Sequence, residues 1–167
     1  MSKVTQKNNI HFKTIKKKNV VITGSSKGLG RALANEFCKN GDTVIINSRN
    51  IFNLITTFNE LNCKYPGQVI AVPGDISRSV DIWMLGICAK MYLGDIDIWI
   101  NNAGTCAYKR RELLELTKFD VDTIVSTNLT GSIYGMKTAI PYMLKQGYGD
   151  IINIDGAGAN GGKSPGY

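Results

Sequence analysis

The sequence has no long apolar run, because Lys, Asp, Asn or Gly interrupts every hydrophobic stretch. A membrane-spanning helix needs ~18–20 consecutive apolar residues, so we expect no span, while peripheral contact with a membrane surface stays open. The 167 residues, of which 43% are hydrophobic and 20% charged, are typical of one globular domain with a single core.

Cysteine and histidine are too few and too scattered for a metal centre. The four cysteines include no C-x-x-C pair, and the one histidine stands at no metal-ligand spacing from them. Neither a zinc site nor a disulfide framework is indicated, so we predict no metal and expect buried or half-buried free thiols in a reducing compartment. The four are Cys38, Cys63, Cys88 and Cys106.

Acidic residues are absent from the first 19 positions, which hold six of the 20 basic residues. The other 14 basic residues face 13 acidic ones, so most of the net charge of +7 belongs to this lead-in. We predict a disordered basic arm over 1–19 and one domain over 20–167; a targeting remnant and a contact for anionic surfaces are the alternatives for the arm. No predicted face interleaves basic and aromatic residues, so we expect no nucleic-acid partner. The six lysines are Lys3, Lys7, Lys13, Lys16, Lys17 and Lys18.

Strands and helices alternate along the rest of the chain. Short apolar runs predict five strands, at 20–22, 44–46, 69–72, 96–100 and 151–154. Helical periodicity predicts helices over 29–40, 52–61, 79–93 and 121–144, the last of them broken or bent near Pro141.

This alternation is typical of an α/β fold, a doubly wound parallel sheet with helices on both faces. Right-handed crossovers favour the strand order 3-2-1-4-5, numbered along the chain. The winding reverses between the first and fourth strands. We therefore expect a ligand crevice at the carboxyl ends of these two strands.

The segment TGSSKGLG, Thr23–Gly30, places three glycines between a strand and a helix. Glycines there permit a tight turn, so that backbone amides at the helix N-terminus approach a pyrophosphate. We predict a nucleotide site in this loop; the alternative is a purely structural turn. The candidate residues are Thr23, Gly24, Ser26, Lys27, Gly28, Leu29 and Gly30.

The spacing of these glycines resembles the cofactor loop of the short-chain dehydrogenases/reductases, a superfamily with a Rossmann-like fold. The motif NNAG after the fourth predicted strand and the segment IVSTNLTG are similar to further motifs of the superfamily. The resemblance implies that the small residues after the strand lie under the cofactor, namely Asn102, Ala103 and Gly104. It also implies that Asn128 bends its helix and holds a water of the proton relay; a satisfied core asparagine is the alternative.

The ends of the second and third predicted strands carry the other cofactor residues. In INSRN, Arg49 and Ser48 can bind a 2′-phosphate with Lys27 nearby, so we predict NADPH rather than NADH; a solvated Arg49 is the alternative. The resemblance further implies that Asp75, followed by Ile76, hydrogen-bonds the adenine. Asp75 could equally cap a turn.

A narrower resemblance joins IWINNAGT, IVSTNLTGSI and NIDGAG to the chlorophyll b reductases of plants and algae. Both have Asp-Gly-Ala-Gly after the fifth strand, here 155–158, where most short-chain reductases have Ser-Ser. The resemblance implies an NADPH-dependent enzyme of chlorophyll catabolism that reduces the 7-formyl group of a small-molecule substrate, chlorophyll b or chlorophyllide b. It also implies a chloroplast protein, with the cytoplasm as the alternative, and a homo-oligomer at full length.

The catalytic residues of the superfamily are a serine, a tyrosine and a lysine four residues after the tyrosine. The place of the serine falls at Gly156, so Ser164, a backbone amide or the tyrosine alone must polarise the carbonyl. Tyr167 falls short of the expected position of the tyrosine; that it is itself this tyrosine is the alternative, and in either case no lysine follows it. We therefore expect an inactive N-terminal fragment that ends before the last strands of the sheet. Another short-chain reductase and a catalytically silent nucleotide-binding module are the alternative functions.

Overall fold

A computed structural model describes residues 16–106 and 113–156 of the chain. Within them, five parallel strands form one sheet in the order β3-β2-β1-β4-β5, which confirms the predicted fold and strand order. The strands are β1 (Asn19–Ile22), β2 (Thr43–Ser48), β3 (Val69–Pro73), β4 (Ile98–Asn101) and β5 (Asp150–Asn153).

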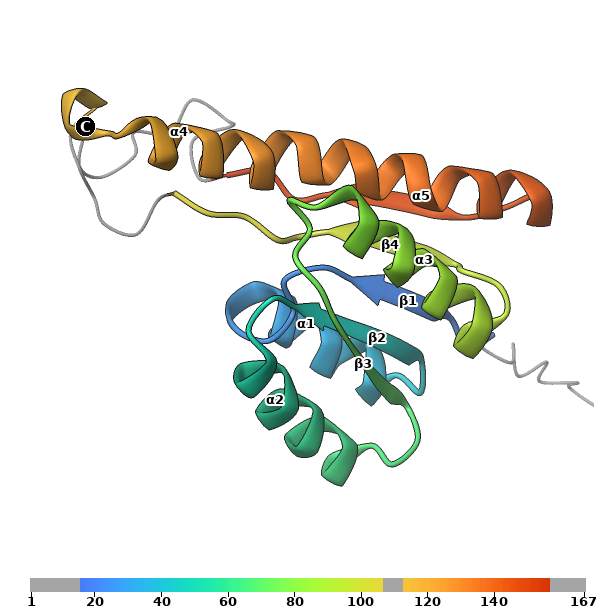
Figure 1. Cartoon of the computed structure of the whole chain (residues 1–167). Helices are drawn as coiled ribbons and strands as arrows, with labels where there is room; N and C mark the ends of the chain where they lie inside the picture. Colours follow the sequence, from blue (N-terminus) through green and yellow to red (C-terminus); the bar gives the residue numbers. More distant parts are fainter. Residues whose placement is uncertain (1–15, 107–112, 157–167) are drawn as a thin grey trace, which may run out of the picture.

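Helices cover both faces of this sheet (Figure 1). Helices α1 and α2 pack on one face, and α3 and α5 on the other. A 3₁₀ turn, η1, a short helix, α4, and a π-helical turn, η2, precede α5. The bounds are α1 (Gly28–Lys39), α2 (Ile51–Lys64), α3 (Ser79–Leu93), η1 (Leu113–Glu115), α4 (Lys118–Ile124), η2 (Val125–Thr130) and α5 (Gly131–Gln146).

The core has two layers, one on each side of the sheet. Val20 and Ile22 of β1 pack toward α1 and α2, whereas Val21 between them packs toward α3 and α5. All three side chains are fully buried, as the alternation of side chains along a strand requires when both faces are covered. This double burial explains why the strand reads as an uninterrupted apolar run.

The predicted break of the last helix near Pro141 is wrong. Helix α5 runs through Pro141, which is exposed, and the missing amide removes only the bond to the carbonyl of Lys137. The α-helical geometry is lost earlier, at η2, which contains Asn128. A π-helical turn inserts one extra residue per turn, so the helix changes its geometry at this asparagine and not at the proline.

Hydrogen bonds anchor the first described residues to the turn before β2 and to the end of α3. The amide of Lys18 donates to Oδ1 of Asp42 at 2.8 Å, and Asn19 begins β1. The side-chain amide of Asn19 then donates to the carbonyls of Leu93 and Asp95, each at 3.0 Å. Residues 1–15 of the predicted arm lie outside the described residues.

The described residues, 16–106 and 113–156, contain neither a candidate metal centre nor a disulfide. No group of His, Cys, Asp and Glu side chains there could hold a metal ion. The cysteines are free thiols, but only Cys38 and Cys88 are buried or half-buried; the prediction is wrong for Cys63 and Cys106, which are exposed. No helix there combines the length and the apolar character that crossing a bilayer requires.

Candidate functional site

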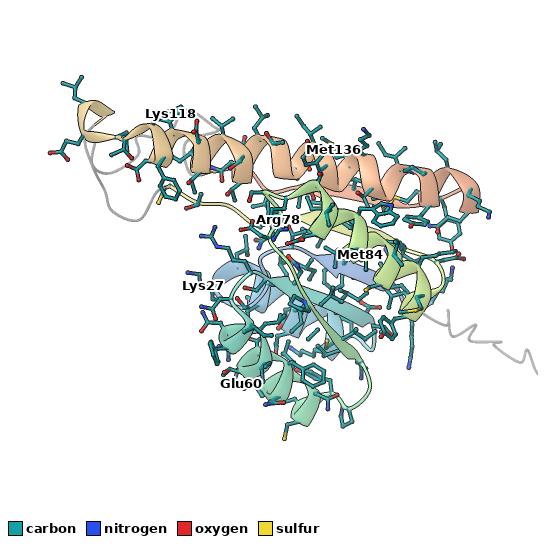
Figure 2. The ribbon with its side chains drawn as sticks, viewed as in Figure 1. Lys27, Glu60, Arg78, Met84, Lys118 and Met136 are labelled. Atoms are coloured by element: carbon teal, nitrogen blue, oxygen red, sulfur yellow. The ribbon has the colours of Figure 1, made fainter. Side chains whose placement is uncertain are left out.

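The glycine-rich loop follows β1 at the point where the winding reverses, at the carboxyl edge of the sheet. Figure 2 shows Lys27 at the start of α1 and Arg78 at the start of α3, both on this edge. Gly24 and Gly28 have φ values of 63° and 56°, a region that favours glycine. Lys27 and Gly28 are exposed there, and Leu29 is 54% exposed, so the start of α1 is open to a ligand.

Two glycines bring the loop against the chain after β4. A Cβ added to Gly24 would lie 2.6 Å from the Cα of Ala103. A Cβ added to Gly30 would collide with the side-chain amide of Asn102. In contrast, nothing lies within 4 Å of such an atom at Gly28, so the space beside it is free. The loop therefore has a crowded side toward β4 and an open side.

Hydrogen bonds between Thr23 and Asn102 fix this close approach. The hydroxyl oxygen of Thr23 accepts from the amides of Asn102 and Ala103, at 3.0 and 3.1 Å. The side-chain amide of Asn102 donates to the carbonyls of Thr23 and Gly24, at 2.9 and 3.2 Å. The side chains of Thr23 and Asn102 hold the loop on the side of β4. These bonds use none of the backbone amides of residues 24–30.

The loop is also joined to β2 and α2, through the predicted residues Ser26 and Ser48 and through three that the sequence reasoning missed, Ser25, Asn47 and Thr57. The hydroxyl of Ser26 donates to that of Ser48 at 2.9 Å, and the hydroxyl of Thr57 donates to the carbonyl of Ser26 at 2.8 Å. The hydroxyl of Ser25 accepts from the amide of Asn47 at 2.9 Å. All five residues are buried. A polar residue at the end of an apolar strand, such as Asn47, is the signal that could have pointed to this network.

Arg49 and Asp75 meet at the ends of β2 and β3. One guanidinium nitrogen of Arg49 lies 3.8 Å from Oδ2 of Asp75, and the two side chains are 44% and 28% exposed. Oδ1 of Asp75 accepts from the amide and the hydroxyl of Ser77, at 2.9 and 2.8 Å. Asp75 therefore makes the turn contact that was one of its two predicted roles, and it faces the cation predicted to bind phosphate. Ser48 lies between the loop and this pair, where its hydroxyl accepts from the amide of Asn50 at 3.2 Å.

Ile76 lies directly after this pair and is buried. A Cβ added to Gly131, at the start of α5, would collide with the Ile76 side chain. The glycine thus lets α5 approach the loop between β3 and α3. The predicted residues of β1, β2, β3 and β4 consequently lie along one edge of the sheet.

Asn128 holds the segment after β4 through both ends of its amide group. Its Oδ1 accepts from the amide of Thr105, and its Nδ2 donates to the carbonyl of Thr105, both at 2.8 Å. Gly104 lies beside it, since an added Cβ there would be 3.5 Å from Oδ1. Asn128 is exposed, so the alternative of a core asparagine is wrong, although the side chain is satisfied. Its main-chain carbonyl accepts from the hydroxyl of Ser132 at 2.9 Å.

Strand β5 ends beside β4 at the same edge of the sheet. The side-chain amide of Asn101 donates to Oδ1 of Asn153 at 2.8 Å and pairs the ends of β4 and β5. Beyond Asn153, the amide of Gly156 donates to Oδ1 of Asp155 at 2.7 Å, and nothing lies within 4 Å of a Cβ added to Gly156. Ser164 and Tyr167 lie outside the described residues.

A family model described as short chain dehydrogenase matches residues 18–164, which include every motif of this edge. The chain belongs to the short-chain dehydrogenase family. This membership confirms the resemblance inferred from the glycine-rich loop and from NNAG. It also makes the carboxyl edge of the sheet the place where a short-chain dehydrogenase holds a nicotinamide cofactor.

Relatives within the family support the narrower resemblance. A protein of Arabidopsis thaliana named "probable chlorophyll(ide) b reductase", chloroplastic, is 42% identical over 165 residues, 89% of this chain and 33% of its own length. A second chloroplastic chlorophyll(ide) b reductase of the same plant is 40% identical over 148 residues, 88% of this chain and 42% of its own length. The chain thus spans less than half the length of these relatives. A crystal structure of L-sorbose reductase from Gluconobacter frateurii, complexed with NADPH and L-sorbose, has a TM-score of 0.76 at 27% identity, covering 83% of this chain and 52% of that one.

Proposed function

We propose that this chain is the cofactor-binding part of an NADPH-dependent reductase that converts the 7-formyl group of chlorophyll b or chlorophyllide b into 7-hydroxymethyl. The observation that carries the proposal is the identity of about 40% to two plant proteins named for this activity, over 89% and 88% of the chain. Their names also place them in the chloroplast, and we extend that location to this protein. The longer protein would be a homo-oligomer.

The loop after β1 fits the pyrophosphate of a dinucleotide. Gly28 opens onto free space at the N-terminus of α1, where backbone amides and the helix dipole favour a phosphate. Thr23 and Asn102 hold the loop rigid without using those amides. When bound, the reduced nicotinamide supplies the hydride. The residues of this chain bind and orient the nicotinamide ring. Ala103 and Gly104, which have little or no side chain, let the ring lie close to the backbone.

The preference for NADPH rests on the charge at the ends of β2 and β3. Arg49 provides a guanidinium that can bind a 2′-phosphate in a bidentate way, and Ser48 and Lys27 stand on the same edge. Oδ2 of Asp75 orients Arg49 toward the proposed 2′-phosphate position, while Oδ1 of Asp75 accepts from the amide of Ser77. We assign the adenine to the side of Asp75 and Ile76.

Asn128 acts on the proton side of the reaction. Its side-chain amide makes one accepted and one donated bond to Thr105, and we assign the water of the relay to its main-chain carbonyl. That carbonyl lies in the π-helical turn, where regular helical bonding is interrupted, and Ser132 is its hydrogen-bond donor. The formyl carbon accepts the hydride and its oxygen accepts a proton, which leaves a primary alcohol.

One experiment separates this function from that of another short-chain reductase. The longer protein containing this chain is supplied with NADPH and either chlorophyllide b or a simple ketone, and the products are separated by chromatography. We expect the 7-hydroxymethyl product from chlorophyllide b and none from the 167-residue chain alone. A longer protein that binds NADPH and reduces only the ketone would contradict the chlorophyll assignment, and one that binds NADPH without any turnover would be the silent module.

A further inference from the structure

Helix α3 has apolar side chains on both its inner and its outer side, which is unusual for a helix on the surface of a domain. Its inner side packs on the sheet through Ile82, Leu85 and Ala89. Its outer side is also apolar, although it faces solvent, because Val80, Trp83, Met84 and Met91 are all exposed. A helix with this pattern is normally covered on both sides. Figure 2 shows Met84 on the ribbon of α3.

A groove runs along the contact between α3 and α5. The helices touch at Gly86, where an added Cβ would collide with Thr138. Beside this contact lies a groove of about 400 Å³ with Trp83, Tyr134, Tyr142 and Pro141 in its walls. Lys137 also lines it, and its carbonyl lacks an amide donor at Pro141. The groove thus joins aromatic walls to a cation.

The charged side chains that α5 contributes near this groove are all basic. Helix α5 contains Lys137 and Lys145 and no acidic residue. Among residues 16–106 and 113–156, neither lysine lies within ion-pair distance of a carboxylate. The acid of α3, Asp81, accepts from the amide of Asp75 at 2.9 Å, so its carboxylate is already engaged.

We call this surface the α3–α5 face, made of exposed side chains and of the groove residues between them. It carries aromatic rings, flexible methionines and unpaired lysines together. Its residues are Val80, Trp83, Met84, Met91, Tyr134, Lys137, Pro141, Tyr142 and Lys145.

The basic lead-in enters the fold at the end of this face. Asn19 bonds the carbonyl of Leu93, the last residue of α3. The ammonium of Lys16 lies 4.8 Å from the centre of the Tyr148 ring, just after α5, and it also pairs with Asp97 at 3.8 Å. The acids at this end are therefore occupied, since Asp95 accepts from Lys90 and from Tyr148 as well.

We propose that the α3–α5 face binds the surface of a lipid bilayer that contains anionic lipids. Tryptophan and tyrosine rings prefer the boundary between headgroups and acyl chains, and lysines beside them bind anionic headgroups. Trp83 and Met84 lie at this boundary, and Lys137 and Lys145 contact phosphates. A second copy of the chain fits less well, because a twofold contact would bring the lysines of this face together without carboxylates. This proposal is independent of the identity of the reduced substrate.

The two tryptophans make the binding measurable in the unmodified chain. Trp83 is 59% exposed and Trp99 is fully buried, so only Trp83 can change its environment. The chain is titrated with vesicles of phosphatidylcholine, with or without one third of phosphatidylglycerol, and binding is measured by flotation and by tryptophan emission. We expect flotation and a shift to shorter wavelength with the anionic vesicles. Both should be lost at about 1 M salt, where the Debye length is ~3 Å. In Trp83→Phe the emission shift should disappear.

Matched charge variants locate the surface. The double variant Lys137→Gln, Lys145→Gln should bind anionic vesicles about 25-fold more weakly, since each lysine near the surface contributes about fivefold. The control, Lys39→Gln with Lys64→Gln, removes two exposed lysines from α1 and α2 on the other face and should bind like wild type. Equal binding to neutral and anionic vesicles, or equal losses in both double variants, would overturn the proposal. A dimer in lipid-free solution whose Trp83 emission is already shifted would assign the face to a second copy.

Discussion

The guanidinium of Arg49 lies 3.8 Å from the carboxylate of Asp75. The two residues, for which the sequence predicted separate roles, therefore form one ion pair in the structure. The acid lowers the net charge that Arg49 offers to an anion. It also holds the flexible arginine near the end of β2, where a 2′-phosphate would lie. On the proposed function, we therefore expect selectivity between the two nicotinamide cofactors to depend on both side chains.

Replacing Arg49 tests this dependence. In Arg49→Ala the affinity for NADPH should fall about 10- to 150-fold, because a charge-assisted bidentate contact contributes about 1.5–3 kcal/mol. The affinity for NADH should change little. Isothermal titration of both cofactors against the 167-residue chain measures the difference, with Lys64→Ala on the outer end of α2 as the control. Equal affinities for NADPH and NADH in the wild type would refute the assignment of Arg49.

The close approach of Gly24 to Ala103 gives a second prediction. Gly24→Ala places a methyl group 2.6 Å from the Cα of Ala103 at a φ of 63°, so both the loop and NNAG must move. We expect cofactor binding to be lost and the free energy of unfolding to fall by more than the ~1–2 kcal/mol of backbone strain alone.

Gly67→Ala is the matched control for this substitution. Gly67 has a φ of 76° with nothing within 4 Å of the added atom, so it isolates the strain from the collision. Urea unfolding of both variants provides the comparison. Similar losses of stability in the two would show that the contact with Ala103 does not matter.

The sequence was sufficient for the sheet and its helices because each strand is a short apolar run between turn residues. Strand β1 could be predicted because both faces of the sheet are covered, so that Val20, Val21 and Ile22 are all fully buried and all apolar. The glycine-rich loop was equally readable, because backbone conformation and close packing leave few residue types for Gly24 and Gly30. These features depend on local chemistry.

The features that sequence reasoning missed depend on partners far along the chain. Pro141 was predicted to break or bend its helix, but the α-helical geometry is interrupted at Asn128, where the family resemblance, not the residue pattern, implied a bend. The two bonds between Asn128 and Thr105, in the segment after β4, were not predicted. The bond from Thr57 to the carbonyl of Ser26 likewise joins residues that only the fold brings together. The periodicity of a sequence does not indicate pairs of residues that are distant along the chain. The hydrogen bonds that join the loop to β2 and α2 could therefore not be predicted.

Cys38 gives a prediction about pH. Burial, and then the charge of Asp42, raise the pKa of its thiol from 9.0 to about 11. The unfolded chain loses this proton at lower pH than the folded chain, so the stabilising effect is complete below pH 9 and is lost as pH rises toward 11. Between these values the wild type should lose up to ~2–3 kcal/mol more of its free energy of unfolding than Cys38→Ala. Denaturant unfolding at pH 8 and pH 10.5 measures this, and parallel losses in both chains would contradict it.

The two hydrogen bonds between Asn128 and Thr105 lead to the last prediction. Asn128→Ala removes both, whereas Asn128→Asp keeps the acceptor for the amide of Thr105 and removes only the donor to its carbonyl. Because each of the two bonds contributes about 0.5–1.5 kcal/mol, the alanine variant should loosen the segment after β4 by about 1–3 kcal/mol. Hydrogen exchange at the amide of Thr105 should then accelerate about 5- to 150-fold in Asn128→Ala and much less in Asn128→Asp. Ser126→Ala, which removes only a bond to the carbonyl of Thr123 within the same helical segment, is the control. If the Thr105 amide exchanges at the wild-type rate in Asn128→Ala, the asparagine does not hold this segment, and its position beside Gly104 has another cause.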